Sequence, residues 1–215
     1  MLNIEENKKI KELNILCKEL RVTPPLDVII DLNMSDLNNN ILYSNKQRAH
    51  SFTRNFWNTL FIKVTGSNHT SDGFGPGYIT VKNTSGGLTT TPPTSNFFTS
   101  NAGLDSNYGI RVNSSDTSFD VNDYTGSFYS TSTLLHQAMS RSMSYDDVTH
   151  EWIVILSRIF VNNSGITRLI NSTGLYNASN IVMERTVLDD TIEMVDSAML
   201  TVNYSISMDF SAIDS

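Results

Sequence analysis

Apolar and polar residues alternate strictly near the end of the chain. Every second residue from Leu200 to Phe210 is apolar, and the residues between them are polar, namely Thr201, Asn203, Ser205, Ser207 and Asp209. This period of two is typical of a β-strand with one face on a core and the other in water. We therefore predict a strand over AMLTVNYSISMDF, residues 198–210.

Other strand-like segments precede it and are separated by polar turns. They are YGIRVN (108–113), HQAMSRSMSY (136–145), EWIVILSRIFV (151–161), TRLINSTGLY (167–176) and IVMERTVL (181–188). The corner NNSG (162–165) predicts a turn after which the chain returns as the next strand. Short strands spaced in this way predict a mainly β fold, an antiparallel β-sandwich of the jelly-roll or immunoglobulin-like type.

The N-terminal segment has a different period. Residues 3–20 place apolar side chains at three- and four-residue steps, which predicts an α-helix with one apolar stripe, made of Ile10, Leu13, Leu16, Cys17 and Leu20. A short helix is marginal alone in water, so this stripe is expected to lie on the body of the protein, on a symmetry mate or on another protein. Ile10, Leu13, Leu16 and Leu20 are the candidate assembly residues.

The chain between this helix and the last strands is less regular. LDVIIDLNM (26–34) predicts a strand, and SFTRNFWNTLFIKVTG (51–66) predicts a short helix running into a strand at LFIKV. Residues 66–107 are rich in Gly, Pro, Ser and Thr and predict loops with one strand-like run, YITVKN. The expected organisation is a helical arm at 1–22, a connecting region at 23–65 and a β-sandwich domain at 66–215, which carries the loops at 66–107.

Charge narrows the range of partners. The net charge is −7 and only 17% of residues are charged, and the lysines at 8, 9 and 11 are balanced by neighbouring glutamates. Nucleic acid is held through clustered Lys and Arg, so no direct nucleic-acid contact is expected. The chain shows no secretion-signal layout and no apolar run long enough for a bilayer, so we expect synthesis in a cytoplasm and no membrane insertion. The single cysteine, Cys17, is expected to be a packed apolar group.

The densest cluster of ionisable residues is YDDVTHEW, with Asp146, Asp147, His150 and Glu151. Two carboxylates and a histidine could serve acid–base catalysis. The alternative is a hairpin tip, because Asp-Asp favours turns and adjacent strand residues point to opposite faces. The hairpin tip is the favoured interpretation, and no catalytic residue is predicted.

Two further motifs are candidate ligand sites. Asp116, Asp120 and Asp123 could offer oxygen ligands to calcium, but their spacing does not match an EF-hand loop, and turn bonds explain them equally. The segment GFGPG (73–77) lacks the Lys-Ser/Thr of a phosphate-binding loop. No cofactor and no metal site are therefore predicted. Trp57 and Trp152 are expected in the core.

Four aromatic residues of the loop region form a candidate contact surface: Phe74, Tyr78, Phe97 and Phe98. Loops on a rigid scaffold are where binding surfaces are commonly displayed. A β-sandwich that presents these residues could be a carbohydrate-binding module, with a host surface glycan as the ligand. Burial in the core or in a subunit interface is the alternative role for the same residues.

Several segments together resemble virion structural proteins of tailed bacteriophages. The matching residues are YGIRVN (108–113) with DVNDY (120–124), WIVILSRIFVNNSG (152–165), GLY (174–176), VMERTVL (182–188) and LTVNYSIS (200–207), with VTPPLDVIIDL (22–32) and SFTRNFWN (51–58) earlier. One departure is that Ser172 and Thr173 stand before Gly174, where relatives often have an acidic-aliphatic pair. The resemblance covers most of the chain.

This resemblance implies a non-enzymatic structural protein of a virion. It is expected in the tail or in the fibre and adaptor region, with capsid decoration or a head fibre as the alternative location. The implied partners are other virion proteins and further copies of the same chain. Assembly would bury the helical stripe on a neighbour, within a symmetric homo-oligomer.

Overall fold

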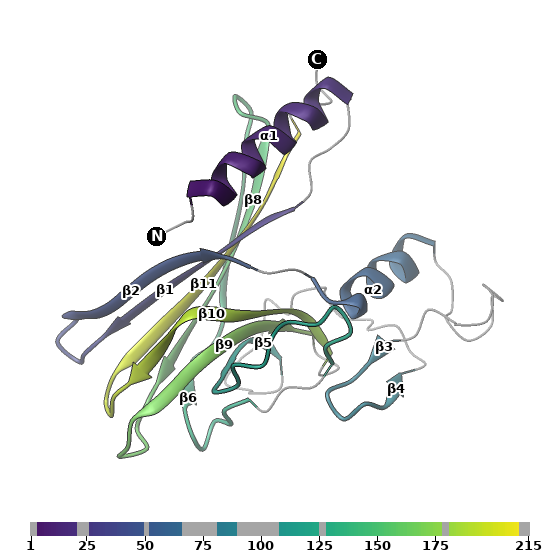
Figure 1. The fold of residues 1–215 in the computed structure, drawn as a ribbon. Helices are drawn as coiled ribbons and strands as arrows, with labels where there is room; N and C mark the ends of the chain where they lie inside the picture. The colour runs from purple at the N-terminus through teal and green to yellow at the C-terminus, as the bar shows by residue number, and fades with distance from the viewer. Residues whose placement is uncertain are drawn as a thin grey trace.

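Two antiparallel β-sheets pack face to face, which confirms the predicted β-sandwich (Figure 1). The structure is a computed structural model, and it describes residues 4–20, 26–49, 52–65, 81–89, 108–124, 128–177 and 181–210. The predicted loop residues Phe74, Tyr78, Phe97 and Phe98 lie outside these described residues, as does the motif GFGPG.

The elements follow one another along the chain with these bounds. The helices are α1 (Ile4–Leu20) and α2 (Arg54–Thr65). The strands are β1 (Asp27–Ser35), β2 (Ile41–Arg48), β3 (Val81–Lys82), β4 (Leu88–Thr89), β5 (Gly109–Asn113), β6 (Leu135–His136), β7 (Ser140–Asp146), β8 (Glu151–Val161), β9 (Arg168–Tyr176), β10 (Val182–Met194) and β11 (Met199–Asp209).

The larger sheet, sheet A, has the order β2-β1-β11-β8, and both β6 and β7 pair with β8. The smaller sheet, sheet B, has the order β10-β9-β5, and β3 with β4 forms a separate two-stranded ladder. β1 and β2 come from the region expected to connect the arm to the sandwich. Through the pairing of β1 with β11, they are instead strands of sheet A.

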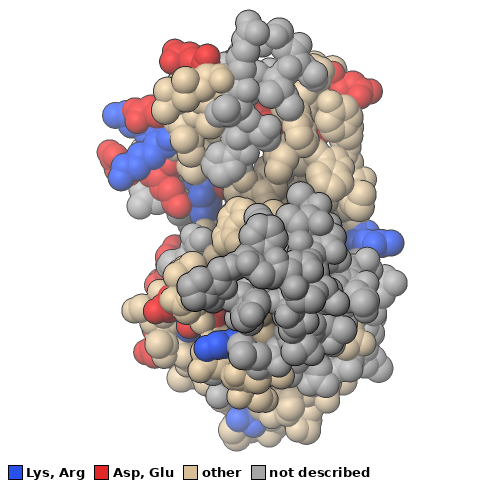
Figure 2. Space-filling model, turned by 90° about the vertical axis from the view of Figure 1, so that its right-hand side faces the viewer, with Lys and Arg blue, Asp and Glu red and all other residues tan. Residues whose placement is uncertain are grey.

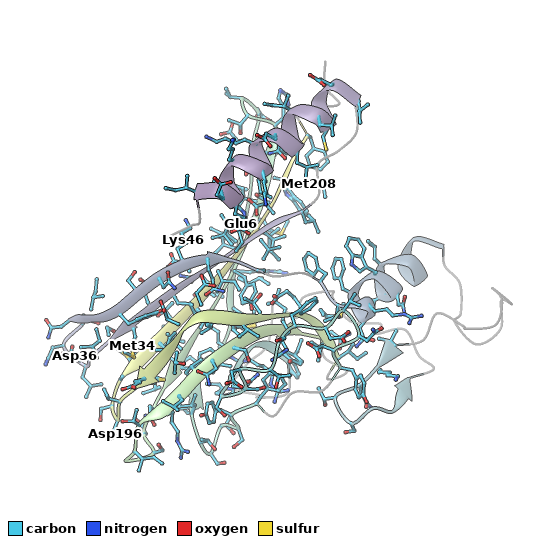
Figure 3. The ribbon with its side chains drawn as sticks, viewed as in Figure 1. Glu6, Met34, Asp36, Lys46, Asp196 and Met208 are labelled. Carbon is cyan, nitrogen blue, oxygen red and sulfur yellow. The ribbon has the colours of Figure 1, made fainter. Side chains whose placement is uncertain are left out.

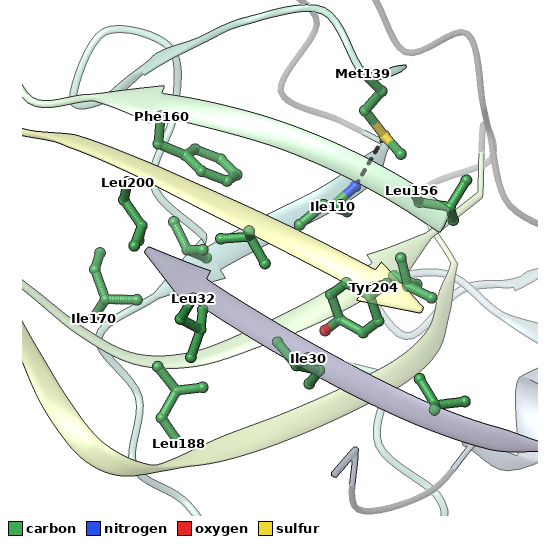
Figure 4. Close-up of a cluster of buried hydrophobic side chains, with 14 of the residues drawn as sticks. Ile30, Leu32, Ile110, Met139, Leu156, Phe160, Ile170, Leu188, Leu200 and Tyr204 are labelled. Carbon is green, nitrogen blue, oxygen red and sulfur yellow. Dashed lines mark hydrogen bonds between the residues drawn. The ribbon is translucent and has the colours of Figure 1, made fainter. Parts of the chain in front are cut away.

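The core lies between the two sheets (Figure 4). Each strand contributes alternate apolar residues, because successive side chains of a strand point to opposite faces. Sheet A contributes Ile30, Leu32, Leu156, Phe160, Leu200 and Tyr204, and sheet B contributes Ile110, Ile170 and Leu188. The alternation predicted for the last strand is confirmed from Leu200 to Ile206, whereas Met208 and Phe210 are only half-buried.

The corner NNSG does not join two strands of one hairpin. β8 pairs within sheet A, whereas β9, which follows the corner, pairs within sheet B. The prediction of a strand, a turn and a strand was therefore right, but the second strand returns in the opposite sheet. A chain that crosses between sheets in this way closes the end of the sandwich.

The helical region at residues 51–66 differs from its prediction. The segment LFIKV is not a strand, since α2 continues to Thr65. Phe52, Phe56 and Leu60 recur at four-residue steps, so a helical conformation places all three on one side. These three side chains pack against the core, and α2 lies on β10, which favours helix over strand here. Phe52 and Phe56 stack with ring centroids 4.0 Å apart. Trp57, expected in the core, is half-exposed.

Three strands also differ in extent. β2 (Ile41–Arg48) had no prediction because its residues show no clear period of two. The segment HQAMSRSMSY is divided into β6 and β7, and β10 continues six residues past the predicted IVMERTVL, to Met194. A register shift between Val187 and Ile192 lets β10 bend and keep pairing with β9.

Sheet A is longer than sheet B at one end (Figure 1). We call residues 140–155 and 205–209 the far end of sheet A, where β7, β8 and β11 extend past the strands of sheet B. α1 lies along this far end, as the positions of Glu6 and Met208 show in Figure 3, whereas Asp36 and Asp196 mark the opposite end of the sandwich.

Candidate functional site

The helix α1 lies on the outer face of sheet A, at the far end. Only a narrow strip of the helix surface contacts the sheet. Ile10 is half-buried, Cys17 is buried, and Arg48 of β2 donates from Nη1 to Asn7 Oδ1 at 2.7 Å. A hollow of about 190 Å³ remains between helix and sheet, and it is lined by Ile10, Asn14, Leu26, Asp27, Thr149, Glu151, Ser207 and Asp209. Few apolar contacts therefore hold this helix.

The predicted apolar stripe is divided by this packing. Leu13, Leu16 and Leu20 are 37%, 49% and 63% exposed, whereas Ile10 and Cys17 face the sheet. Residues 10 and 17 lie about 20° apart around the helix axis, while residues 13, 20 and 16 are turned about 60°, 80° and 120° from residue 10 to one side. The structure thus leaves three of the four candidate assembly residues on the surface.

The cluster Asp146, Asp147, His150 and Glu151 lies at the tip of the β7–β8 hairpin. Asp146 Oδ1 accepts hydrogen bonds from the backbone N–H groups of Val148 and Thr149, at 2.8 and 3.0 Å. These bonds lower the pKa of Asp146, because they stabilise the charged carboxylate. The hydroxyl of Tyr145 lies 3.3 Å from His150 Nδ1. The geometry is that of a turn, as the favoured interpretation predicted.

Two aspartates of the connector between β5 and β6, Asp120 and Asp123, also have structural partners. Asp120 Oδ1 accepts from the backbone N–H of Asn122 at 2.7 Å, and Asp123 forms an ion pair of 2.9 Å with Arg185. Arg185 also donates to the carbonyl oxygens of Thr117 and Ser118. Arg185 thereby fastens the connector to the outer face of sheet B. Among the described residues, no three His, Cys, Asp or Glu side chains come together as metal ligands.

A buried polar cluster between the sheets was not predicted. Glu184 of β10 is fully buried, and Tyr204 Oη donates to its Oε2 at 2.8 Å. Thr186 hydrogen-bonds to Oε1 of the same carboxyl, and Thr173 Oγ1 lies 3.3 Å from Tyr204 Oη. Because Tyr204 belongs to sheet A and the other three residues to sheet B, the cluster joins the two sheets.

Burial raises the pKa of Glu184 to about 8. The hydrogen bonds from Thr186 and Tyr204 and the charge of Arg185 act in the opposite direction and lower this pKa, but burial has the larger effect. The carboxyl group is therefore protonated at neutral pH. Burial and the neighbouring Glu184 also raise the pKa of the Tyr204 phenol. A raised carboxyl pKa is a common mark of a catalytic acid, but this group has no exposure to a substrate. Its chemistry is that of an internal hydrogen bond.

Two buried arginines were likewise not predicted from the sequence. Arg158 of β8 donates from Nε to Gln137 O at 2.9 Å, and from Nη1 to the carbonyl oxygens of Tyr108 and Ile110 at 2.8 and 3.0 Å. Arg111 of β5 lies over the rings of Phe128 and Tyr176, at 4.1 and 5.1 Å from their centroids. Arg158 connects β8 of sheet A with β5 of sheet B.

The corner that carries NNSG is held from inside. Asn162 is fully buried, and its Nδ2 donates to Ile166 O at 2.8 Å and to Met194 O at 2.7 Å. Asp196, from the β10–β11 corner, accepts from the backbone N–H of Gly165 at 2.7 Å. The two corners that link the sheets are thus tied to each other, and the polar residues of this motif are structural.

Gly174, the first residue of the motif GLY (174–176), has a packing role. A Cβ added there would lie 2.6 Å from the carbonyl oxygen of Glu184 and 3.1 Å from the ring of Tyr176. No side chain fits at that distance. The glycine of the GLY motif therefore permits close approach of β9 and β10.

The far end of sheet A exposes an unexpected apolar surface. Met143 and Tyr145 of β7 are 59% and 50% exposed, and Trp152 of β8 is half-exposed beside them, opposite Tyr145. They lie on the same face of sheet A as the core residue Leu156, but beyond the cover of sheet B. Figure 2 shows the molecule narrowing below this end, and charged side chains lie on both sides of this upper part, more densely at its left.

Neither described helix is long and apolar enough to cross a membrane. Comparison of the chain with protein-family models, with curated proteins and with solved structures finds no match.

Proposed function

We propose that this chain is a non-enzymatic structural subunit of a tailed-bacteriophage virion, in the tail or in the fibre and adaptor region, and that it acts by assembly. The observation that carries the assembly role is the exposed leucine row of α1, Leu13, Leu16 and Leu20. An amphipathic helix that leaves such a row in water is the kind of element that a groove on another subunit covers.

The chemistry of the described residues supports a structural role. The ionisable groups that the sequence singled out make turn bonds at the β7–β8 tip and an ion pair across the connector. Among the carboxyl groups that the structure describes, only Glu184 has a raised pKa, and it is enclosed between the sheets. The virion location rests on the sequence resemblance, and a capsid-surface location would use the same helix.

The carbohydrate-binding alternative has no specific observation in its favour. Its candidate residues, Phe74, Tyr78, Phe97 and Phe98, lie outside the described residues. A glycan array probed with and without calcium tests it directly, and binding that is lost in a Phe97→Ala variant would support it.

The test of the assembly role is incorporation into particles. We expect Leu16→Lys to reduce incorporation at least about tenfold. The substitution would bury an unpaired charge in the contact, and the desolvation cost of that charge exceeds the binding free energy that the other contacts of the helix could supply. Leu42→Lys, on the half-exposed Leu42 of β2, is the matched control and should incorporate normally. Quantitative immunoblotting of purified particles measures both.

Either of two results would overturn the proposal. Normal occupancy of Leu16→Lys would remove the helix from the mechanism. Immunogold labelling that finds the protein on no particle would remove the virion role, and labelling of the head in place of the tail would select the capsid alternative.

A further inference from the structure

The strand β7 forms an unprotected edge of sheet A. Its seven residues, Ser140 to Asp146, are all exposed, and among the described strands it pairs only with β8. The pairing is regular from Ser140 opposite Ser157 to Asp146 opposite Glu151, without a bulge. A regular edge strand presents a row of unpaired N–H and C=O groups to any strand that approaches.

The opposite edge of the same sheet is built differently. β2 carries Lys46 and Arg48, and its register with β1 shifts between Met34 and Ser35. Charged side chains and bulges are devices by which proteins keep sheet edges from pairing with other chains. β7 contains no lysine, no proline and no bulge, and its two charged residues, Arg141 and Asp146, stand near its two ends. The contrast within one sheet indicates that the β7 edge is left open for a partner.

The side chains of β7 are complementary to those of a second copy of β7. Arg141, Met143 and Tyr145 share one face with Trp152 and Leu156. The other face carries Ser140, Ser142, Ser144 and Asp146. The positive residue stands near the start of the strand, and Asp146 and Asp147 stand at its end. An antiparallel arrangement therefore brings the positive end of each strand to the acidic end of the other.

We propose that β7 pairs with β7 of a second copy about a two-fold axis at Ser144, which joins the two A sheets into one. A two-fold axis perpendicular to the sheet places the same face of both copies on the same side of the joined sheet. Odd-numbered residues of one strand therefore pair with odd-numbered residues of the other, and even-numbered residues with even-numbered ones. In this register Met143 lies opposite Tyr145 of the second copy, and Arg141 lies beside the acidic end of the second strand, Asp146 and the turn residue Asp147. Sulfur–aromatic and opposite-charge pairs across strands are both favourable.

This interface does not depend on the proposed virion role or on α1. β7 and the leucine row of α1 are separate surfaces, so one chain can pair through its strand and bind another protein through its helix. Because the contact is isologous, it closes with two copies and adds no further chains.

Sedimentation velocity over a range of protein concentrations tests the pairing. We expect a dimer for the wild-type chain and a dissociation constant raised at least about tenfold for Met143→Lys, since two added charges would meet near the axis. Leu42→Lys on the opposite edge should dimerise like wild type. Leu16→Lys should also remain dimeric, which separates this interface from the proposed assembly role of α1.

Cross-linking tests the register. Cysteine at the axis should form a disulfide with its own copy, because paired Cα atoms of antiparallel strands are about 4.5–5.5 Å apart. Ser144→Cys should therefore give a covalent dimer on mild oxidation, whereas Ser44→Cys on β2 should not exceed the wild-type background from Cys17. A monomeric wild-type protein at high concentration, or unchanged dimerisation of Met143→Lys, would overturn the proposal.

Discussion

Glu184 illustrates how a single residue depends on its surroundings in this fold. Its carboxyl group is enclosed between the sheets and hydrogen-bonded to Tyr204 and Thr186. Burial raises the pKa of Glu184 to about 8, so the neutral form is the one that the fold accommodates. In the unfolded chain the same group has an ordinary pKa near 4.5. The proton is therefore held more tightly in the folded state.

The pH dependence of stability follows from that difference. Between about pH 4.5 and about pH 8 the folded state binds a proton that the unfolded state has lost, so the free energy of unfolding falls as pH rises, by up to about 1.4 kcal/mol per unit. Glu184→Gln keeps the size and the hydrogen bond to Tyr204 but cannot ionise. We expect its urea midpoint to change less than that of wild type between pH 5 and pH 8.

The control for this prediction is Glu193→Gln. Glu193 is exposed on the same strand, and the variant should follow the wild-type pH profile. Parallel profiles for Glu184→Gln and wild type would contradict the account of a protonated buried carboxyl.

At the scale of the element, α1 is a helix, as predicted, but few buried contacts attach it to sheet A. Its period of three and four residues was sufficient to predict the helix at 3–20, and Cys17 is buried as expected. Its orientation was not predictable, because the stripe is wider than the surface that sheet A offers it. The sheet accepts Ile10 and Cys17 and leaves Leu13, Leu16 and Leu20 outside. An element held by few buried contacts opens locally before the rest of the fold unfolds.

Thiol labelling of Cys17 measures this opening. We expect a thiol reagent to modify Cys17 in native buffer at a rate that depends only weakly on urea, because detaching α1 exposes little surface. Ile10→Ala removes a contact with the sheet and should speed labelling roughly fivefold, for a loss of about 1 kcal/mol. Leu16→Ala removes an outward side chain and should leave the rate unchanged. Labelling with the full urea dependence of global unfolding would show that α1 does not open alone.

At the scale of the whole molecule, polar residues join two sheets that apolar packing alone would only stack. The connections are Tyr204 to Glu184 in the middle, Arg158 to Ile110 O of β5 at one side, and Asn162 to Met194 O at the corners. Each of these side chains is buried with its partner. A buried polar contact of this kind requires one relative position of the sheets, because any shift would leave a polar group unpaired.

Arg158→Met tests the contribution of these contacts. The substitution keeps an unbranched apolar stem but leaves carbonyl oxygens of Gln137, Tyr108 and Ile110 without their donor, so we expect a loss of about 2–4 kcal/mol in the free energy of unfolding. Urea denaturation followed by tryptophan fluorescence measures it. Arg54→Met, on the exposed Arg54 of α2, is the control and should stay within about 0.5 kcal/mol of wild type. A loss equally small for Arg158→Met would mean that apolar packing alone positions the sheets.

The sequence by itself determined the elements whose pattern is local. β8 was predicted with its observed bounds, and the predicted bounds of α1, β5, β9 and β11 differ from the observed ones by no more than one residue. These bounds were predictable because periods of two and of three to four are properties of neighbouring residues. The turn at NNSG was predictable for the same reason. LFIKV was ambiguous because a short apolar run is compatible with either period, and packing on β10 decided it as helix.

Only the tertiary structure decided which strands share a sheet, and which side chains lie outside the core. β9 follows the corner into sheet B because its pairing with β10 and β5 is long-range, and no local pattern encodes it. The same long-range packing buries Glu184, Arg158 and Asn162, whose residue types suggest a surface. It also ends sheet B short of sheet A, which leaves Met143 and Tyr145 uncovered. Local periodicity sets the elements, and the contacts between distant segments set which side chains remain exposed.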